Sequence, residues 1–414
     1  MQYYYTGIKA RKGLEKVLGK PIKKFLNLFG YLKCTALYFF AVIISVFLKR
    51  KPFYKDLWLV AERGADARDN GYHFFKYLCL NHKDINCVYV IDISSPDYEK
   101  IATLGKTVQP GSFKHYLAFA CATAKISTHI MGYAPDSYRF AILDRKLNIV
   151  KGKKIFLQHG IIKDNIYELY FPKVHLDLFI CSTVREQESI EKDYNYPDGV
   201  IKRIGLCRYD ALLKEHTVKR QILVMPTWRY YLRELDEEGF KKSEYYKMFN
   251  GLITDGRLLR LLEENGYELV LYLHYELQKF TYLFSGKENL IKITGIKDAD
   301  VQKLLMESAM LITDYSSIFF DFAYMKKPLC YWMFDRELFF SEQYGKGYFS
   351  FDDDGFGPVC SEKDEVIDYI EHELSTDMAL EKKYEDRIKS NFDDFSENHC
   401  EKTYEEILKL LGCM

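Results

Sequence analysis

Three signals that would place a chain in a familiar class are missing from this sequence of 414 residues. Lys plus Arg and Asp plus Glu both number 59, so no excess of positive charge indicates a nucleic-acid-binding protein. The ten cysteines are scattered singly, without a C-x-x-C pair or a Cys/His cluster at the spacing of metal ligands. This pattern predicts a reduced, cytosolic protein without structural zinc.

The glycine-rich loops that commonly hold phosphates are missing as well. The chain contains neither G-x-x-x-x-G-K-[S/T] nor G-x-G-x-x-G, and the glycines within residues 62–71 fit neither spacing. No internal repeat or low-complexity segment is present. If this chain binds a phosphate, a structural feature other than a glycine-rich loop must hold it.

The first 55 residues have a composition of their own. Residues 1–30 carry seven basic residues against one acid, Glu15, and an apolar run from Cys34 to Leu48 is closed by the bases at 49–51. The run is shorter than the roughly 20 apolar residues of a full span, and no small-residue cleavage site of a signal peptide follows it. Two interpretations remain: a membrane-surface segment with Lys and Arg on anionic headgroups, or a buried core helix with a basic lead-in. The two flanking basic clusters favour the membrane segment.

From residue 56 onward, short apolar runs alternate with helix-length segments. Continuous apolar strands of this kind are typical of parallel sheets covered by helices on both faces. The predicted strands form two series: 56–62, 86–92, 125–130, 153–160 and 177–182, then 220–227, 267–274, 290–294, 309–314 and 328–332. We therefore predict an α/β fold with four parts: a membrane-associating segment at 1–55, two facing Rossmann-like domains at 56–215 and 216–395, and a C-terminal helix at 396–414.

Polar residues follow five of the expected strands. In open α/β sheets ligands lie at the carboxyl ends of the strands, so these residues predict one cleft between the domains. A further strand is expected at 202–204, and the residues that follow a strand are His159 and Gly160; Arg208 and Asp210, after 202–204; Thr227 and Arg229; His274; and Asp314, Ser316 and Ser317.

The stretch MLITDYSSIFFDFA (310–323) places polar residues between two apolar segments. Ser316 or Ser317 is placed to cap a helix that runs through Ile318, Phe322 and Met325. Capping alone would explain an isolated pair of serines. A helix N-terminus with free N–H groups and two hydroxyls is also an anion site, so we predict that a phosphate binds here.

Two histidines end apolar strands, one in each predicted domain. A single histidine at a strand end is more often structural than catalytic. His159 and His274, facing each other across a cleft beside a phosphate site, suit general-base work and phosphate stabilisation. His129 has the same setting and is a third candidate.

Four blocks of the sequence resemble the conserved blocks of the CDP-glycerol glycerophosphotransferase family, which includes teichoic-acid primases and polymerases. The blocks are ITDYSSIFFDFAYMKKPLCYW, LQHGIIK, MPTWR and GLCRYDAL, within a resemblance that runs from about residue 57 to residue 390. The resemblance implies a GT-B type enzyme at the cytoplasmic face of the membrane. Such an enzyme transfers polyol phosphate from a CDP-polyol to a hydroxyl of a lipid-linked acceptor and releases CMP, in teichoic-acid or capsule synthesis.

The resemblance also implies roles for single residues, with His159 as the base and His274 at the donor phosphates. The donor-binding blocks contain Arg229, Thr313, Asp314, Ser316, Ser317 and Asp321. Other cleft positions are Lys163, Arg208, Asp210 and Thr227, and the acceptor side has Asp69, Asn70 and His129. No Asp/Glu pair predicts a metal cage, so we expect no tightly bound cofactor, and any Mg²⁺ would arrive with the donor.

Two other functions stay open at this point. A GT-B glycosyltransferase that uses a nucleotide sugar would need the same fold and a base in the cleft, and only the chemistry of the donor separates it from the first hypothesis. A membrane-bound scaffold with a decayed site is the non-enzymatic alternative. The presence of both His159 and His274 together with the serine pair argues against decay.

Overall fold

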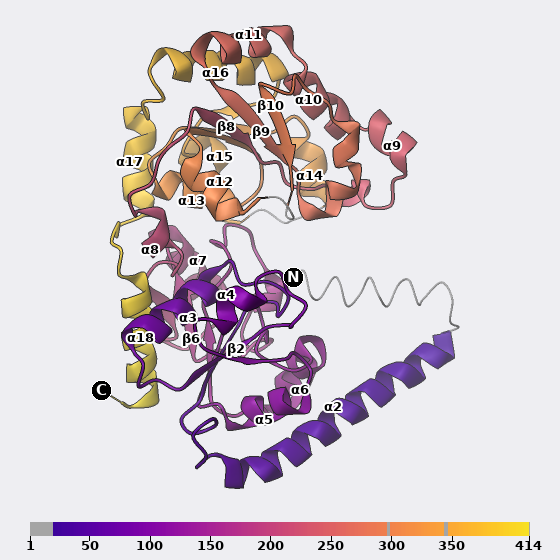
Figure 1. Cartoon of the computed structure of the whole chain (residues 1–414), viewed down its shortest axis with the longest axis vertical. Helices are drawn as coiled ribbons and strands as arrows, with labels where there is room; N and C mark the ends of the chain where they lie inside the picture. The colour runs from indigo at the N-terminus through magenta and orange to yellow at the C-terminus, as the bar shows by residue number, and fades with distance from the viewer. Residues whose placement is uncertain (1–19, 296–298, 343–346, 414) are drawn as a thin grey trace.

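The computed structural model describes residues 20–295, 299–342 and 347–413. Two α/β domains lie one above the other along the long axis of the molecule (Figure 1). Each is built on a parallel sheet, one of seven strands in the order β3-β2-β1-β4-β5-β6-β7 and one of six in the order β10-β9-β8-β11-β12-β13. The predicted fold of two facing Rossmann-like domains is confirmed.

The first domain contains strands and helices that alternate along the chain. Its strands are β1 (Trp58–Ala61), β2 (Cys87–Val90), β3 (Lys106–Val108), β4 (Ala124–Ser127), β5 (Lys153–Phe156), β6 (Leu178–Cys181) and β7 (Ile201–Arg203). Its helices are α3 (Asn70–Asn81), α4 (Tyr98–Ala102), α5 (Phe113–Cys121), α6 (Ser137–Leu147), η1 (Tyr167–Leu169), α7 (Val184–Asp193) and α8 (Tyr209–Leu212).

The second domain repeats the alternation with a smaller sheet. Its strands are β8 (Gln221–Val224), β9 (Glu268–Tyr272), β10 (Ile291–Thr294), β11 (Met310–Thr313), β12 (Leu329–Trp332) and β13 (Val359–Cys360). Its helices are η2 (Tyr230–Leu232), α9 (Glu237–Lys242), α10 (Glu244–Ile253), α11 (Gly256–Asn265), η3 (Tyr275–Leu283), α12 (Val301–Glu307), α13 (Ile318–Tyr324), α14 (Arg336–Glu342), α15 (Phe351–Asp354) and α16 (Lys363–Ser375).

The strand order places one switch point in each sheet. In the first sheet the order reverses between β1 and β4, and in the second between β8 and β11. The crevice beyond the carboxyl ends of such strands is where open α/β sheets bind ligands. The fold therefore directs attention to the residues that follow these four strands.

The two domains are fastened together by an apolar cluster that both contribute to. Ile161 and Leu206 of the first domain are buried with Phe319 and Phe320 of α13. The ring of Tyr209 stacks on Tyr324 of α13 with 4.1 Å between the ring centroids. The base of the cleft is therefore closed by packing.

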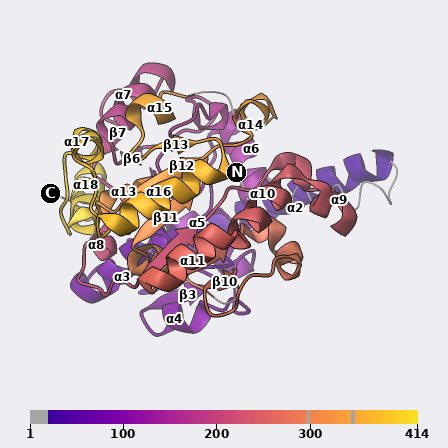
Figure 2. The ribbon, with the colours of Figure 1, turned by 90° about the horizontal axis from the view of Figure 1, so that it is seen from above.

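The C-terminal helices α17 (Lys382–Asn391) and α18 (His399–Leu411) run along the edge of both domains (Figures 1 and 2). Cys400 and Ile407 of α18 are buried in the core of the first domain. The carboxylate of Asp210 accepts hydrogen bonds from the backbone N–H groups of His399 (2.7 Å) and Cys400 (2.9 Å). Asp210, expected to face the cleft, instead holds the N-terminus of α18, because unpaired N–H groups at a helix start attract a carboxylate.

Helix α2 (Lys20–Leu48) packs lengthwise against α5, at the opposite end of the molecule from α17 and α18 (Figure 2). Its buried stripe contains Cys34, Tyr38, Ala41 and Ser45, which recur at the spacing of one helical face. The rest of the described helix is apolar but exposed; Phe47, for example, is 75% exposed. This exposure excludes the interpretation of the apolar segment as a buried core helix. Asn27–Leu48 is long and apolar enough to cross a membrane by length and composition, so the apolar segment is longer than the sequence indicated.

Candidate active site

The switch point of the first sheet brings two histidines together. The carbonyl of Ala61 in β1 accepts a hydrogen bond from Thr128 (3.3 Å), and the carbonyl of Ser127 in β4 accepts one from Leu157 (2.9 Å). These bonds set the chain after β4 beside the chain after β5. As a result the rings of His129 and His159 stack, with 4.7 Å between centroids and 13° between planes.

The backbone around His159 is held from two sides. The side-chain amide of Asn70, at the start of α3, donates to the carbonyl of Gln158 (2.8 Å). The guanidinium of Arg208 donates to the carbonyl of His159 itself (3.0 Å). Gln158 has φ +60°, a backbone conformation that side-chain-bearing residues adopt rarely. The loop is thus fixed in a strained form, with the His159 ring against that of His129.

The imidazole of His159 is uncharged at neutral pH. The protein around it disfavours the charged form and lowers the pKa of the imidazole to about 3, and the positive charges of Arg63 and Arg208 lower it further. A hydrogen bond to the backbone of Thr128 acts in the opposite direction. At neutral pH the ring is therefore unprotonated and able to accept a proton.

His274 lies at the end of β9 in the second domain. Its Nδ1 accepts a hydrogen bond from the backbone N–H of Glu276 (3.3 Å), so in the neutral ring the proton is on Nε2. Its ring stacks with Trp228 at 6.0 Å between centroids. Burial lowers its pKa to about 4, so the ring is a neutral hydrogen-bond donor at pH 7.

The serine pair lies at the start of α13, as predicted. The helix begins at Ile318 and ends at Tyr324, one residue before the expected Met325. The hydroxyl of Ser317, the N-cap residue, makes no capping hydrogen bond. A methyl group built on Gly160 would come within 2.7 Å of that hydroxyl, so the loop after His159 contacts the start of α13 across the domain boundary.

The structure corrects the expected phosphate contact of Arg229. Its side chain is fully buried, and its guanidinium pairs with both carboxylate oxygens of Asp335 (2.6 and 2.9 Å) and with Asp314 (2.9 Å). Asp314 in turn accepts the backbone N–H groups of Thr227 and Tyr315. Arg229 and Asp314 therefore hold the loops after β8 and β11 in place and do not face a ligand.

Arg208 and Asp321 form a second buried ion pair and are likewise corrected as direct ligands. Both carboxylate oxygens of Asp321 on α13 accept from the guanidinium of Arg208 at 2.8 Å. The same guanidinium reaches Asp69 at 2.8 Å, and the backbone N–H of Arg208 donates to Asn70. Asp69 and Asn70, expected on the acceptor side, thus join α3, the His159 loop and α13 under the cleft.

The remaining predicted residues differ in whether their side chains already have a partner within the protein. Lys163 is buried, and its ammonium pairs with Asp164 at 2.6 Å. The hydroxyl of Thr313 donates to the carbonyl of Met225 (2.8 Å), which joins β11 to the loop after β8. These two side chains are occupied within the protein. The buried hydroxyl of Thr227 has no hydrogen-bond partner within the described part of the chain.

Sequence reasoning missed Arg63, which follows β1 directly at the switch point. The side chain is partly exposed, and it makes no ion pair with the residues that the structure describes. Its positive charge lowers the pKa of His129, His159 and His274, so it acts on the histidines of both domains. The only sequence signal was its place after an apolar strand, where the glycines nearby indicated a surface turn.

Glu62, next to Arg63, was also missed. Its carboxylate accepts the backbone N–H groups of Arg68 (3.0 Å), Asp69 (2.9 Å) and Tyr72 (2.7 Å). Burial, with the neighbouring carboxylate of Asp69, raises its pKa. Glu62 fixes the turn that leads into α3 and is already engaged by the backbone.

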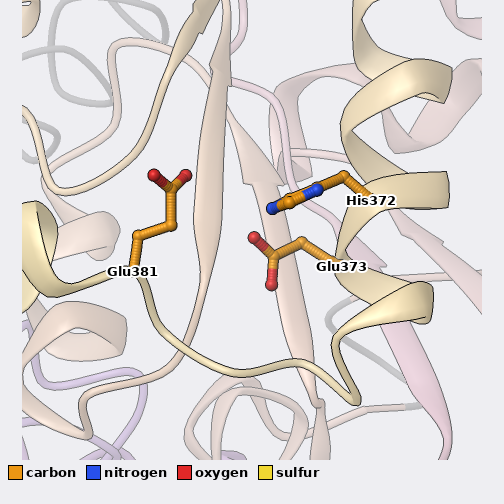
Figure 3. Close-up of side chains that lie close together, drawn as sticks. All are labelled: His372, Glu373 and Glu381. Atoms are coloured by element: carbon orange, nitrogen blue, oxygen red, sulfur yellow. The ribbon is translucent and has the colours of Figure 1, made fainter.

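One group of side chains in the described residues has the spacing of metal ligands, and it lies outside the cleft. The ligand atoms of His372, Glu373 and Glu381 lie within 4.8 Å of one another (Figure 3). They come from the end of α16 and the residue before α17, on the side of the second domain that is away from the first (Figure 1). Burial raises the pKa of the Glu373 carboxyl, which weakens it as a ligand. The group has no part in the site between the domains.

Two parallel-sheet domains whose switch points face each other, with a neutral histidine from each, define a protein of the GT-B class. The chain belongs to the CDP-glycerol:poly(glycerophosphate) glycerophosphotransferase family, whose model matches residues 42–409. This match confirms the resemblance found in the sequence blocks.

The relatives agree with this assignment. The chain is 30% identical over 379 residues to the minor teichoic acid biosynthesis protein GgaB of Bacillus subtilis (strain 168), matching 89% of this chain and 41% of that protein. It is 33% identical over 171 residues to the teichoic acid poly(glycerol phosphate) polymerase of the same strain, matching 39% of this chain and 20% of that protein. The chain thus spans less than half the length of these relatives.

The fold is similar to that of the wall teichoic acid polymerase TagF. The TM-score is 0.63 at 17% identity, and the likeness covers 94% of this chain and 98% of that one. A likeness at this identity establishes the common architecture of the two proteins.

Proposed function

We propose that this protein transfers a polyol phosphate, glycerol phosphate or ribitol phosphate, from a CDP-polyol to a hydroxyl of a lipid-linked acceptor. CMP is released, and the product is part of a teichoic acid or a capsular polymer. Membership of the family and the teichoic acid names of the relatives support the proposal. The structural observation that carries it is the contact between the His159–Gly160 loop and Ser317, which sets a neutral imidazole beside a serine hydroxyl that makes no capping hydrogen bond at a helix start.

The reaction needs a base at the attacking hydroxyl. His159 takes the proton of the acceptor hydroxyl while that oxygen attacks the β-phosphorus of the donor in line with the bridging oxygen. The bond from the β-phosphorus to the bridging oxygen breaks, and its electron pair leaves with CMP. The polyol phosphate remains on the acceptor as a phosphodiester, and His159 loses the proton to solvent. General-base help of this kind is worth about 10²–10⁴ in rate.

The donor diphosphate needs hydrogen-bond donors that are already in position. In this proposal the Nε2–H of His274 and the hydroxyls of Ser316 and Ser317 bind its oxygens from the second domain. Phosphoryl transfer relies mainly on such positioning and charge stabilisation. Arg229 and Asp314 act indirectly, because they fix the loops that carry these groups.

The proposal includes no resident metal ion, and any Mg²⁺ enters with the donor. The nearby carboxylates of Glu62 and Asp69 support this view because protein groups already engage them. Glu62 accepts three backbone N–H groups, and Asp69 pairs with Arg208. Mg²⁺ is commonly carried to phosphoryl-transfer sites by the phosphates themselves.

We further propose that α2 lies on the cytoplasmic face of the membrane. The exposed apolar side chains of the helix would enter the lipid, and the exposed bases that flank it, Lys33 and residues 49–51, would meet anionic headgroups. Packing along α5 supports a helix that lies in the interface, because a helix bound lengthwise to a domain keeps that domain beside it.

Calorimetric binding of CDP-glycerol, CDP-ribitol, CMP and several UDP-sugars tests the choice of donor. We expect one CDP-polyol to bind selectively, and Ser316→Ala/Ser317→Ala to weaken it about 10-fold or more, since hydrogen bonds to charged groups are worth about 1.5–3 kcal/mol. Ser390→Ala, an exposed serine of α17, is the control. Binding of a UDP-sugar without preference for cytidine would point to a glycosyltransferase.

A transfer assay with His159→Ala tests the base. We expect a loss of about 10²–10⁴ in rate with donor affinity retained. His372→Ala, an exposed histidine remote from the cleft, should keep full activity. Transfer by His159→Ala at the rate of the His372→Ala control would contradict the assignment.

A further inference from the structure

The positive charges that the sequence predicted for the cleft, Arg229 at the donor phosphates and Arg208 and Lys163 at other positions, are neutralised inside the protein. Arg229 is paired with Asp335 and Asp314, and Arg208 is paired with Asp321 and Asp69. Lys163 is likewise paired with its neighbour in the chain. A diphosphate that enters the cleft meets none of these charges directly. Its own negative charge therefore needs another cation.

Arg63 lies at the switch point of the first sheet, where a bound diphosphate would need a cation. It is the second residue after β1, at the switch point between β1 and β4, on the same edge of the sheet as His129 and His159. Its backbone is fixed on both sides. The carbonyl of Glu62 lies against Gly132, where an added methyl group would approach it to 2.5 Å, and the carbonyl of Gly64 accepts from Asp92 at 2.7 Å.

The charge of Arg63 reaches across the cleft. It acts on His129 and His159 in its own domain and on His274 in the other. Because charge interactions weaken with distance, all three rings lie within electrostatic range of this one guanidinium. Within the described residues its side chain has no carboxylate partner.

We propose that Arg63 binds the phosphoryl group that is transferred, from the side opposite Ser316 and Ser317. This inference rests on the proposed function and assigns the residue that faces the β-phosphate on the first domain. A planar guanidinium with several N–H donors suits two phosphate oxygens at once. Held on a fixed turn, it would stabilise the charge that develops on those oxygens as the bond to CMP breaks.

Kinetics of Arg63→Ala and Arg63→Lys test the inference. Loss of one preorganised donor to the transition state costs about 10²–10³ in rate, so we expect kcat/KM of Arg63→Ala to fall by about that factor, with Arg63→Lys between it and wild type. Affinity for CMP should be unchanged, because CMP lacks the transferred group. Arg68→Ala is the matched control: this arginine of the same turn is paired with Asp97 (2.7 Å).

A pH profile separates direct contact from a structural role. Among the described residues, Arg63 and Arg208 are the charged groups whose positive charge acts on His159, and the His159 ring stacks on His129. Removal of Arg63 should raise the pKa of His159 and move the acidic limb of kcat/KM to higher pH. Loss of structure alone would lower the rate without moving the limb. Activity and limb equal to those of Arg68→Ala would overturn the inference.

Binding of inorganic pyrophosphate keeps the test independent of catalysis. By calorimetry, Arg63→Ala should bind pyrophosphate about 10-fold or more weakly than Arg68→Ala, since one charge-assisted contact is lost. If wild type transfers from no CDP-polyol but shows this difference, the proposed function fails and the anion site at Arg63 stands. Equal pyrophosphate binding by the two variants overturns the assignment of Arg63.

Discussion

At the residue scale, the imidazole of His159 is a weak base, and the proposed reaction requires its pKa to rise when the donor binds. With a pKa of about 3 the imidazole is neutral at pH 7 but holds a proton poorly. Part of this depression comes from the positive charges of Arg63 and Arg208. A bound diphosphate would offset those charges and favour the imidazolium. Donor binding would thus raise the pKa of His159 toward the working pH at the moment when the proton has to be accepted.

This coupling predicts two different pH profiles. The profile of kcat/KM reports the free enzyme and that of kcat the bound complex. A base must be unprotonated, so activity falls as pH drops through its pKa. We expect the acidic limb of kcat to lie at higher pH than that of kcat/KM, and the limb of kcat/KM to lie well below pH 6.5. Coincident limbs near 6.5 would contradict the coupling. Circular dichroism at each pH controls for unfolding.

The place of a single residue in the site could be predicted from the sequence where it depends only on the residue following an apolar strand. His159 and His274 follow apolar strands, and the edge of a parallel sheet is where such strands end. The state of Arg229 was not predictable, because its partner Asp335 is 106 residues away in the chain. Arg63 was missed for the converse reason: a charged residue in a glycine-containing turn is usually solvated, and only the fold places it at the switch point.

At the level of elements, three helix starts meet below the cleft. Asp69 begins α3, Arg208 precedes α8, and Asp321 lies in the first turn of α13. Their side chains form one buried network that also holds the backbone of His159. This network joins the two domains at the point where the proposed base and the serine pair have to be in register.

Asp321→Asn tests the network. Removing one partner of a buried ion pair leaves the other charge uncompensated and costs about 3–5 kcal/mol. Because Asp69 would still pair with Arg208, we expect the free energy of unfolding in denaturant to fall by about 3 kcal/mol. Asp368→Asn breaks an exposed pair with Arg257 and should leave the free energy of unfolding nearly unchanged, because solvent screens such pairs. Unchanged stability with weakened donor binding would restore Asp321 as a donor-site residue.

The strands that are buried could be predicted from the sequence, and two short strands at the edges of the sheets could not. Ten strands were predicted from continuous apolar runs, and each has a counterpart in the two sheets, as has the further strand expected at 202–204, which is β7. Strands β3 and β13 were missed because they are short edge strands; β3 begins with the exposed Lys106, and β13 has two residues. The burial of α18 in the first domain was also missed, since its apolar spacing shows a buried face but not which domain covers that face.

At the scale of the whole molecule, the proposed base and the exposed apolar helix α2 belong to one domain. Helix α2 packs on α5 of the first domain, the domain that carries His159 and Arg63. The second domain is attached through the base of the cleft and through α17 and α18, at the far end from α2 (Figure 2). If α2 binds the membrane as proposed, a lipid-linked acceptor would approach the base from the first domain, and the soluble donor from the second.

Phe40→Glu/Phe47→Glu tests this arrangement. Both side chains are exposed on α2, at 57% and 75%. Burial of a Phe side chain is worth about 1.5–3 kcal/mol, so charging both positions should weaken sedimentation with anionic vesicles about 100-fold or more. Leu147→Glu is the matched control, because Leu147 is 65% exposed on α6 of the same domain.

Added salt should weaken the binding of wild type, since the bases at 49–51 contribute about 1 kcal/mol each near such a surface. If the variant binds vesicles like wild type but changes its oligomeric state on size exclusion, the apolar face of α2 covers a second copy of the chain and not lipid.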